Sequence, residues 1–438
     1  MWNRPFCGTT RFMSETLVTD ARSVALDALS QILRRRQALD DALRLDGIAD
    51  ARDRAFARLL VATTLRRKGQ IDDVLARCLE KLPPPPIEDL LRLGVAQLLF
   101  LEVKPHAVVD SAVEMAKSTG FAPLGKLVNA VLRRISTEGQ AWVATQDPAP
   151  LNTPDWLWRS WIASYGEAAA REIAAAHLTE PPLDLTPAGS AEMWAQRLEA
   201  AELFTGSLRR AAGGSVTALP GYEQGGWWVQ DAAATLPVRL LDPHPGEHIA
   251  DLCAAPGGKT AQLAAAGAVV TALDRSARRL SRLQENLTRL ALSAELVAAD
   301  ASAWQPPALF DKVLLDAPCS ATGTLRRHPD VAWTKQPSDV EKLAAAQDRL
   351  LAAAAEMVKP NGVLVFCTCS LQPEEGAARI DQFLRTNPRF RRLPVEAGEV
   401  GGLSDLVSAA GDLRTLPSHL AEIGGMDGFF AGRLRRIA

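Results

Sequence analysis

Hydrophobic positions divide the chain into two halves with different periodicity. Between about residues 17 and 135, apolar residues such as Leu29 and Leu33 recur every three or four positions, which places them on one face of a helix. The proline run at 83–86 must interrupt these helices, because proline lacks the backbone donor and clashes with the preceding turn. The pattern predicts an all-α domain over residues 17–140.

From about residue 226 onward, short apolar runs alternate with alanine-rich helical stretches. The five runs with the length of buried strands lie at residues 248–252, 268–273, 296–299, 312–315 and 363–366. Strand and helix repeated in this way predict an α/β fold with a doubly wound parallel sheet over residues 226–438. Residues 141–225 lose both periodicities and carry several prolines, which predicts a small α+β linker domain.

Composition excludes several classes of protein. The 438 residues are 47% hydrophobic and 23% charged, as in an ordinary globular chain. No apolar run approaches the roughly 20 residues of a membrane-spanning helix, so we expect no membrane contact. Six cysteines, crowded toward the second half, do not form a disulfide framework, so we expect a reducing, cytoplasmic location. Residues 1–16 lack the apolar stretch of a secretory signal and are interpreted as an extension, in which Met13 is an alternative start to Met1.

The formal net charge of -2 gives no general attraction to nucleic acid. Any RNA contact must therefore come from local basic clusters. The helical half contains three such clusters, which are Arg34–Arg36, Arg66–Lys68 and Arg133–Arg134. Arg66, Arg67 and Arg133 are our candidates for RNA binding with salt-dependent affinity. A solvated helix face with no ligand is the alternative interpretation.

Polar residues follow each predicted strand at the edge where open parallel sheets bind ligands. These residues are Asp251, Asp274, Asp300, Asp316 with Cys319, and Cys367 with Cys369. Because the carboxyl ends of parallel strands meet at one edge, four carboxylates and the thiols are expected to line a single rim.

The loop after the first of these strands contains Gly257 and Gly258, just before a predicted helix at Lys259. Glycine permits a sharp turn and close approach of a ligand, and free amides at a helix start suit an anionic or carboxylate-bearing ligand. Asp274 stands where an acid on the second strand usually binds a pair of ribose hydroxyls. Together these residues predict a nucleoside-containing cofactor, although the glycines alone are weak evidence, since they also occur in ordinary tight turns.

Cys319 and Cys369 are candidates for covalent chemistry, because both lie in loops at the predicted rim, where nearby amides can lower a thiol pKa. Cys78 and Cys367 are interpreted as small buried hydrophobes. Zinc is the rival use of the cysteines, but the pairs lack the two-residue internal spacing of zinc sites and no His lies at ligand spacing, so we expect no metal. The pattern does not decide which loop cysteine is the nucleophile.

A thiolate beside a methyl-bearing cofactor has a defined use on a pyrimidine. The C5 atom is too poor a nucleophile to accept a methyl group unaided, and attack of a thiolate at C6 turns the ring into an enamine whose C5 is nucleophilic. An acid such as Asp316 can bond the N3 and N4 edge of the base. A base must then remove the C5 proton before the thiol leaves.

Four groups of residues resemble the motifs of the Sun/Fmu family of RNA cytosine-5 methyltransferases. They are Asp251–Thr260, Asp316–Thr324 with Arg326–Asp330, Thr368–Ser370 with Pro373–Glu375, and Gly425–Phe430. The helical half is similar to the NusB-like RNA-binding domain of the bacterial ribosomal members, including Asn129–Arg133. The resemblance covers all of the C-terminal half and is weakest over the linker domain.

The resemblance implies a Rossmann-like domain that transfers methyl groups from S-adenosylmethionine to C5 of a cytosine in small-subunit (16S) ribosomal RNA, as a monomer. It assigns Cys369 as the nucleophile and Cys319 to release of the product. Asp316 lies between cofactor and base, and the other cofactor-binding residues are Cys253, Ala254, Ala255, Pro256, Gly257, Gly258, Lys259, Asp274 and Asp300.

Three alternatives stand beside this interpretation. Methylation of transfer RNA keeps the same chemistry and changes only the substrate. An RNA-binding ribosome-assembly factor with an inactive catalytic domain would leave the cysteines, acids and glycine loop without a use. A disulfide oxidoreductase built on Cys367 and Cys369 has one intervening residue, which is not the usual spacing, and it leaves the acids unexplained.

Overall fold

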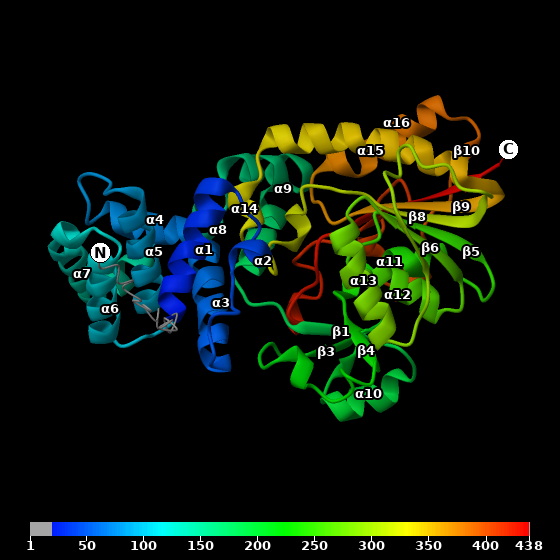
Figure 1. Ribbon diagram of the computed structural model, residues 1–438. Coiled ribbons are helices and arrows are strands. Elements are labelled where there is room, and N and C mark those ends of the chain that lie inside the picture. The colour runs from blue at the N-terminus through cyan, green and yellow to red at the C-terminus, as the bar shows by residue number, and fades with distance from the viewer. Residues whose placement is uncertain (1–19, 438) are drawn as a thin grey trace, which may run out of the picture. The chain divides into compact units, whose positions relative to one another are not determined.

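The computed structural model describes residues 20–437, so the predicted extension at 1–16 and the alternative start at Met13 lie outside the described residues. The chain divides into two compact units (Figure 1). The first unit extends to Thr64 and includes Ile71–Trp142, and the second comprises Leu65–Gln70 and the chain from Val143 onward.

In its described part, the first unit is built from helices, as the apolar periodicity predicts. The helices are α1 (Ala21–Arg35), α2 (Leu39–Ala42), α3 (Ala51–Arg66), α4 (Lys68–Ala76), α5 (Pro85–Leu99), α6 (Pro105–Ser118) and α7 (Gly125–Val143). α5 begins inside the proline run with Pro85, because a proline in the first turn loses no helical hydrogen bond. The junction of α3 and α4 belongs to the second unit.

From Val143 onward, the second unit contains α8 (Pro148–Leu151) and α9 (Asp155–His177), followed by a four-stranded sheet. Its antiparallel strands have the order β2 (Ala201–Glu202), β3 (Leu208–Arg210), β1 (Leu183–Pro187) and β4 (Trp227–Val229), and α10 (Ala191–Leu198) follows β1 in the chain. β4 lies beyond the domain boundary that we expected at residue 225. The boundary was placed too early because the apolar run of β4 is also typical of the start of the catalytic domain. Pairing with β1 places β4 in the small sheet.

The larger sheet has eight strands, and five adjacent strands that extend to one edge of the sheet are parallel. In the order β9 (Val358–Thr368), β8 (Phe310–Asp316), β5 (His248–Leu252), β6 (Val269–Asp274) and β7 (Glu295–Ala298), they correspond to the five predicted runs. The antiparallel strands β10 (Phe390–Arg392), β11 (Leu413–Arg414) and β12 (Phe430–Arg436) extend it beyond β9. The sequence does not reveal β12, since Arg433 interrupts its apolar residues and is buried among partners distant in the chain, Glu399 and the backbone oxygens of Leu240 and Pro394.

Helices cover both faces of this sheet, as the doubly wound fold requires (Figure 1). One face packs against α11 (Ala232–Leu241), α12 (Gly258–Ala265) and α13 (Ala277–Arg289). The other packs against α15 (Pro337–Met357) and α16 (Ala377–Thr386), and the short α14 (Val331–Thr334) precedes α15. Neighbouring strand residues alternate between the two cores: Ile249 belongs to the first and Ala250 to the second.

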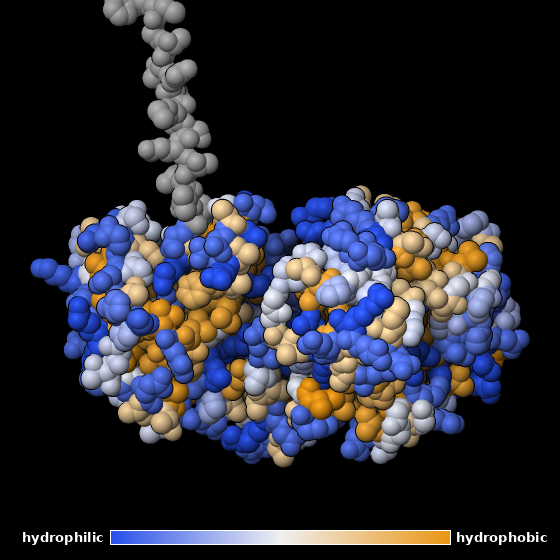
Figure 2. Space-filling view, turned by 90° about the horizontal axis from the view of Figure 1, so that it is seen from below, coloured by the Kyte–Doolittle hydropathy of each residue, from blue (hydrophilic) through white to orange (hydrophobic). Residues whose placement is uncertain are grey.

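The molecular surface is mostly hydrophilic in the view of Figure 2, with apolar residues in patches between the charged ones. Over residues 20–437, no helix combines the length and the apolar character that crossing a bilayer requires.

Candidate active site

The predicted site residues come together because four of the parallel strands end at the same edge. β5 lies between β6 and β8, and all three run parallel. In the pairing of β8 with β9, Asp316 lies beside Cys367. The loops that begin after Leu252, Asp274, Asp316 and Thr368 therefore meet at this rim.

Asp251 does not line the rim as expected, because its side chain is fully buried. One carboxylate oxygen accepts a hydrogen bond of 2.6 Å from the Thr260 hydroxyl on α12, and the other has no partner. Burial raises the pKa of Asp251 to about 7, although the bond from Thr260 lowers it in part. Asp251 thus anchors α12 from beneath the rim.

The loop between β5 and α12 turns through two residues with left-handed backbone. Cys253 has φ 62° and Gly257 has φ 105°, a conformation that glycine adopts without steric cost. A Cβ at position 257 would lie 2.6 Å from Cγ of Leu283, so packing against α13 also requires glycine. The amide of Ala255 donates to the Asp274 carboxylate at 3.3 Å, which joins this loop to the end of β6.

A pocket beside this loop is lined by three of the predicted cofactor residues, Cys253, Asp274 and Asp300. The Asp300 carboxylate accepts from the backbone and hydroxyl of Ser302 at 2.9 and 2.7 Å, and these bonds lower its pKa. The Asp274 carboxylate is buried and pairs with Arg279 at 3.2 Å. Ala254, Ala255, Pro256, Gly257, Gly258 and Lys259 are not among the residues that line this pocket.

Lys259 instead extends toward the end of β8. Its ammonium donates to Asp316 at 2.8 Å and lies 5.0 Å from the ring centroid of Phe429. Burial alone would lower the pKa of Lys259, but the charge of Asp316 outweighs burial and raises it. The other oxygen of Asp316 accepts from the thiol of Cys367 at 3.5 Å, and burial raises the pKa of that thiol, so Cys367 is a neutral donor.

Cys319 and Cys369 come from loops that are 50 residues apart in the chain, yet their sulfur atoms lie 3.5 Å from each other. Both side chains are partly exposed. The hydrogen bond with Cys369, together with burial, raises the pKa of Cys319 well above its ordinary value. Between residues 20 and 437, no group of three or more His, Cys, Asp and Glu side chains is arranged to hold a metal ion.

Comparison with known proteins places this geometry in a family. A family model described as 16S rRNA methyltransferase RsmB/F matches residues 238–435, and the NusB family model matches residues 19–137. A ribosomal RNA small subunit methyltransferase B of Pseudomonas putida is 35% identical, over 95% of this chain and 98% of that relative. The chain belongs to the ribosomal RNA small subunit methyltransferase B family.

Solved structures agree with the fold of this family member. The crystal structure of PH0851 has a TM-score of 0.77 and 22% identity, and covers 96% of this chain and 100% of that chain. At this identity the likeness shows the fold alone. The structure of a methyltransferase homologue from Pyrococcus horikoshii has a TM-score of 0.54 and 28% identity, over 64% of this chain and 93% of that chain. A helical NusB domain and an α/β methyltransferase domain with a mixed sheet thus make up this ribosomal RNA methyltransferase.

Sequence reasoning missed the buried residues that support the two cysteine loops of the methyltransferase domain. Glu375 is fully buried and accepts hydrogen bonds from Ser320 and Ser370, each of which follows a loop cysteine. The linker helix α9 also contacts this region: the Tyr165 hydroxyl donates to the backbone oxygen of Leu371. The Pro373–Glu375 motif could have pointed to Glu375. However, proline followed by two glutamates is also typical of the first turn of a surface helix, so the motif does not indicate burial.

The arginines proposed for RNA binding occupy different environments. The guanidinium of Arg66 donates to the backbone oxygen of Arg326 at 2.7 Å, and that of Arg67 donates to Gln70 at 3.0 Å, all within the second unit. Arg133 is exposed on α7, where it donates to Asn129 at 3.0 Å. Exposure suits a phosphate contact at Arg133, whereas the bond of Arg66 is a structural one.

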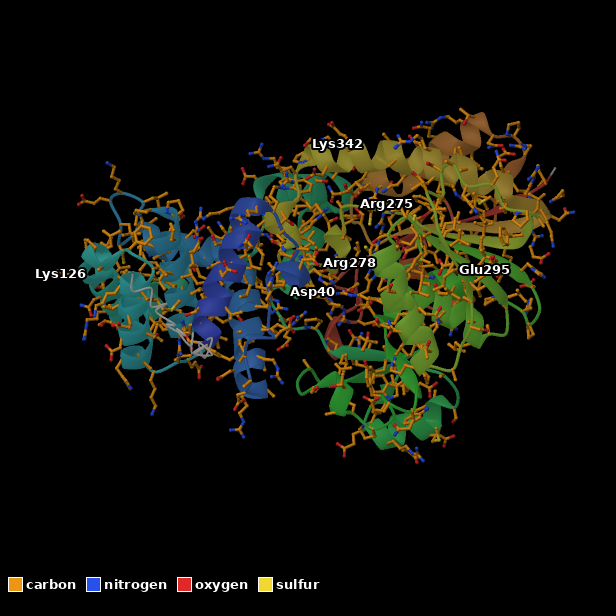
Figure 3. All side chains as sticks on the ribbon, in the orientation of Figure 1. Asp40, Lys126, Arg275, Arg278, Glu295 and Lys342 are labelled. Carbon is orange, nitrogen blue, oxygen red and sulfur yellow. The ribbon has the colours of Figure 1, made fainter. Side chains whose placement is uncertain are left out.

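Further arginines surround the cofactor pocket. Arg275, Arg279 and Arg349 are exposed and contribute to its lining. Figure 3 labels Arg275 and its exposed neighbour Arg278, which lie at the beginning of α13, beside the end of β6. The pocket therefore has carboxylates within it and cations at its rim.

Proposed function

We propose that this protein transfers a methyl group from S-adenosylmethionine to C5 of a cytosine in small-subunit ribosomal RNA, and that Cys369 bonds covalently to C6 of the base. The observation that carries the proposal is the pair of sulfur atoms of Cys319 and Cys369, 3.5 Å apart at the rim that also presents Asp316. The relatives named ribosomal RNA small subunit methyltransferase B support the substrate class.

The pocket residues fit a nucleoside-containing methyl donor. The carboxylates of Asp274 and Asp300 lie at the ends of neighbouring strands, and carboxylates accept hydrogen bonds from ribose hydroxyls and amino groups. When bound, S-adenosylmethionine supplies a methyl group on a positively charged sulfur. The pocket also contains Cys253, whose pKa is raised to about 12 by burial and by the neighbouring acids, so this thiol stays neutral and does not compete for the methyl group.

The first chemical step is attack by Cys369. Its sulfur forms a bond to C6 of the cytosine, and the electron pair of the C5–C6 double bond shifts toward N3 and C5, which makes C5 nucleophilic. Asp316 is 31% exposed and lies close enough to the rim to contact the N3 and N4 edge of the base. Lys259 holds one oxygen of Asp316 at 2.8 Å and so fixes the orientation of this carboxylate.

Release of the product requires loss of the C5 proton. The electron pair left by this proton restores the C5–C6 double bond, and the C6–S bond breaks to return Cys369 as a thiolate. We assign Cys319 to this step, because its sulfur lies next to that of Cys369. Its thiolate, formed when the thiol proton passes to water, accepts the C5 proton, and the raised pKa of Cys319 makes that thiolate a strong base.

The test is methyl transfer from labelled S-adenosylmethionine to unmodified small-subunit ribosomal RNA, with wild type, Cys369→Ala and Cys319→Ala compared on a denaturing gel. We expect the wild type to label C5 of cytosine, Cys369→Ala to be inactive, and Cys319→Ala to remain covalently bound to RNA. If Cys319→Ala is inactive and Cys369→Ala is trapped, the roles of the two cysteines are reversed. Undiminished transfer by Cys369→Ala would sink the covalent mechanism.

The choice of RNA substrate in this assay, together with a binding measurement, distinguishes the alternatives. Labelling of transfer RNA in preference to ribosomal RNA would move the activity to that substrate while keeping the chemistry. Absence of S-adenosylmethionine binding in calorimetry, together with retained RNA binding, would show an inactive assembly factor.

A further inference from the structure

A buried carboxylate connects the two cysteine loops. Glu375 has no exposed surface, and one of its oxygens accepts from the backbone amide of Ser320 at 2.9 Å. Its other oxygen accepts from the hydroxyls of Ser320 and Ser370, the latter at 2.6 Å. Ser320 directly follows Cys319 and Ser370 directly follows Cys369, so one side chain holds the neighbours of both thiols.

We propose that Glu375 is a positioning residue that holds the thiols of Cys319 and Cys369 at reacting distance. The inference rests on the proposed function for its catalytic meaning, but the geometry that it concerns is a property of the protein without RNA. Glu375 acts through the two serines and touches neither cysteine sulfur in the described contacts.

The surrounding hydrogen bonds require an acceptor at this position. Besides the two serines, Gln347 points its amide toward Glu375 at 3.5 Å and anchors itself on the backbone oxygen of Pro318 at 2.9 Å. Every neighbour of the carboxylate is thus a donor, which an ionised carboxylate satisfies and a side-chain amide does not. Burial raises the pKa of Glu375, while the bonds from Ser320 and Ser370 lower it.

Other bonds already join the loops, and they indicate that the fold survives without Glu375. The amide of Gly323 donates to the oxygen of Cys369 at 2.9 Å, and the amide of Ala317 donates to the oxygen of Cys367 at 2.9 Å. These backbone bonds keep the loops adjacent. Glu375 lies between the loops and holds the two serines. Its loss should therefore change the distance between the two cysteine sulfurs but not the path of the chain.

The chain offers a matched control, because Glu374 is the preceding residue and is exposed. Glu375→Gln keeps the shape of the side chain but turns an acceptor into a donor that faces serine donors. We expect its kcat for methyl transfer to fall about tenfold to a hundredfold, since a displacement on the order of 1 Å costs that much in a reaction between positioned groups. The KM for RNA and the Kd for S-adenosylmethionine stay unchanged, and Glu374→Gln behaves as wild type.

A second measurement reports the thiol geometry without catalysis. Phenylarsine oxide condenses with two thiols to give a dithioarsenite and water: two As–S bonds form, the As–O bond breaks, the thiol protons leave in the water, and arsenic stays As(III). Wild type and Glu374→Gln should bind one equivalent tightly, while Cys319→Ala and Cys369→Ala should not. Glu375→Gln should bind about tenfold more weakly, because the sulfurs are no longer held together.

The two measurements separate the possible failures. If Glu375→Gln matches wild type in arsenical affinity and in kcat, the positioning role is overturned, and lost activity with unchanged arsenical affinity also overturns it. If the wild type does not methylate RNA, the proposed function fails, but the arsenical comparison still decides the role of Glu375. Ser370→Ala removes one of the bonds to the carboxylate, together with the hydroxyl's contacts to Ser320, Thr322 and the Gln372 amide, and keeps the bonds from Ser320 to Glu375. It should show smaller losses of the same kind if Glu375→Gln does not fold.

Discussion

Single residues at the strand ends owe their properties to burial among like charges. Burial, together with the charges of Asp251, Asp274 and Asp316, raises the pKa of Cys253 in the loop before α12. Lys259 is the ammonium that pairs with one of these acids. The site therefore holds its negative charge through the ion pairs of Lys259 with Asp316 and of Arg279 with Asp274 and through several hydrogen bonds, and this makes its stability sensitive to pH.

Asp251 should make folding stability depend on pH. Its folded pKa of about 7 lies above the ordinary value of 3.8, so its contribution to stability is fully present below about pH 4 and is lost as pH rises through 7. We expect wild type to lose up to about 4 kcal/mol more than Asp251→Asn between pH 4 and pH 8. Urea unfolding at both pH values measures this difference, and equal losses would contradict the raised pKa.

Gly323 should tolerate no side chain. A Cβ there would lie 1.9 Å from the backbone oxygen of Gly428, whose amide donates to the oxygen of Gly323 at 2.8 Å. We expect Gly323→Ala to lower stability by about 1–3 kcal/mol and to impair methyl transfer, because the loop that carries Cys319 must shift. Gly398→Ala is the control, since a Cβ there meets nothing within 4 Å. Thermal unfolding with equal losses for both variants would contradict the clash.

At the scale of elements, two adjacent arginines tie distant segments of the second unit together. Arg326 is fully buried and contacts Asp231 at 3.3 Å and Asp427 at 3.1 Å, while Arg327 contacts Asp231 at 2.7 Å. Asp231 caps α11 by accepting from the amide of Ala233 at 2.8 Å. The motifs Arg326–Asp330 and Gly425–Phe430 thus have a structural use, which is to join the catalytic loop to the start of α11.

Removing the buried charge of Arg326 should destabilise the second unit. We expect Arg326→Met to lower the free energy of unfolding by about 3–5 kcal/mol, since it leaves the buried carboxylates of Asp231 and Asp427 short of a partner. Arg391→Met, at an exposed position of β10, should cost less than about 0.5 kcal/mol. Denaturant titration of both variants measures these losses. Similar unfolding midpoints for the two variants would show that the ion-pair network of Arg326 contributes little to stability.

At the scale of the whole molecule, the net charge of -2 means that RNA affinity depends on particular surface groups. The exposed Arg133 and the arginines beside the cofactor pocket are available on the surface. Arg66 is bonded inside the second unit, and burial lowers its pKa. Arg66 and Arg133, which the sequence offered equally as candidates for RNA binding, are thus expected to affect RNA affinity differently.

We expect Arg133→Ala to weaken RNA binding and to reduce the slope of log affinity against log salt by about 1, as loss of one phosphate contact does. Arg66→Ala should leave that slope unchanged and instead lower the melting temperature, because its bond to the Arg326 oxygen is internal. RNA binding at four salt concentrations, with thermal unfolding of each variant, measures both effects. The reverse outcome would make Arg66 the phosphate contact.

The helices, the five parallel strands and the edge of the sheet that carries the candidate site all follow from local patterns in the chain. Apolar runs of strand length predicted β5 at 248–252 and its four parallel neighbours, because strands buried on both faces must be continuously apolar. Parallel strands end at one edge, so the acids and cysteines after them had to converge there. Asp274 and Asp300 were predicted in this way, while Cys253 was implied by the family resemblance, and all three line one pocket.

Contacts between side chains from distant segments, in contrast, follow only from the folded chain. The 3.5 Å between the sulfurs of Cys319 and Cys369, the burial of Asp251 and the hydrogen bonds of Glu375 with Ser320 and Ser370 depend on side chains from separate segments, and no local pattern encodes them. Strand β12 was not predicted for the same reason, since the buried Arg433 is paired with groups from other segments, among them Glu399 and the Leu240 oxygen. Periodicity records which face of an element is buried, whereas pairing of polar groups depends on what the rest of the chain brings to that face.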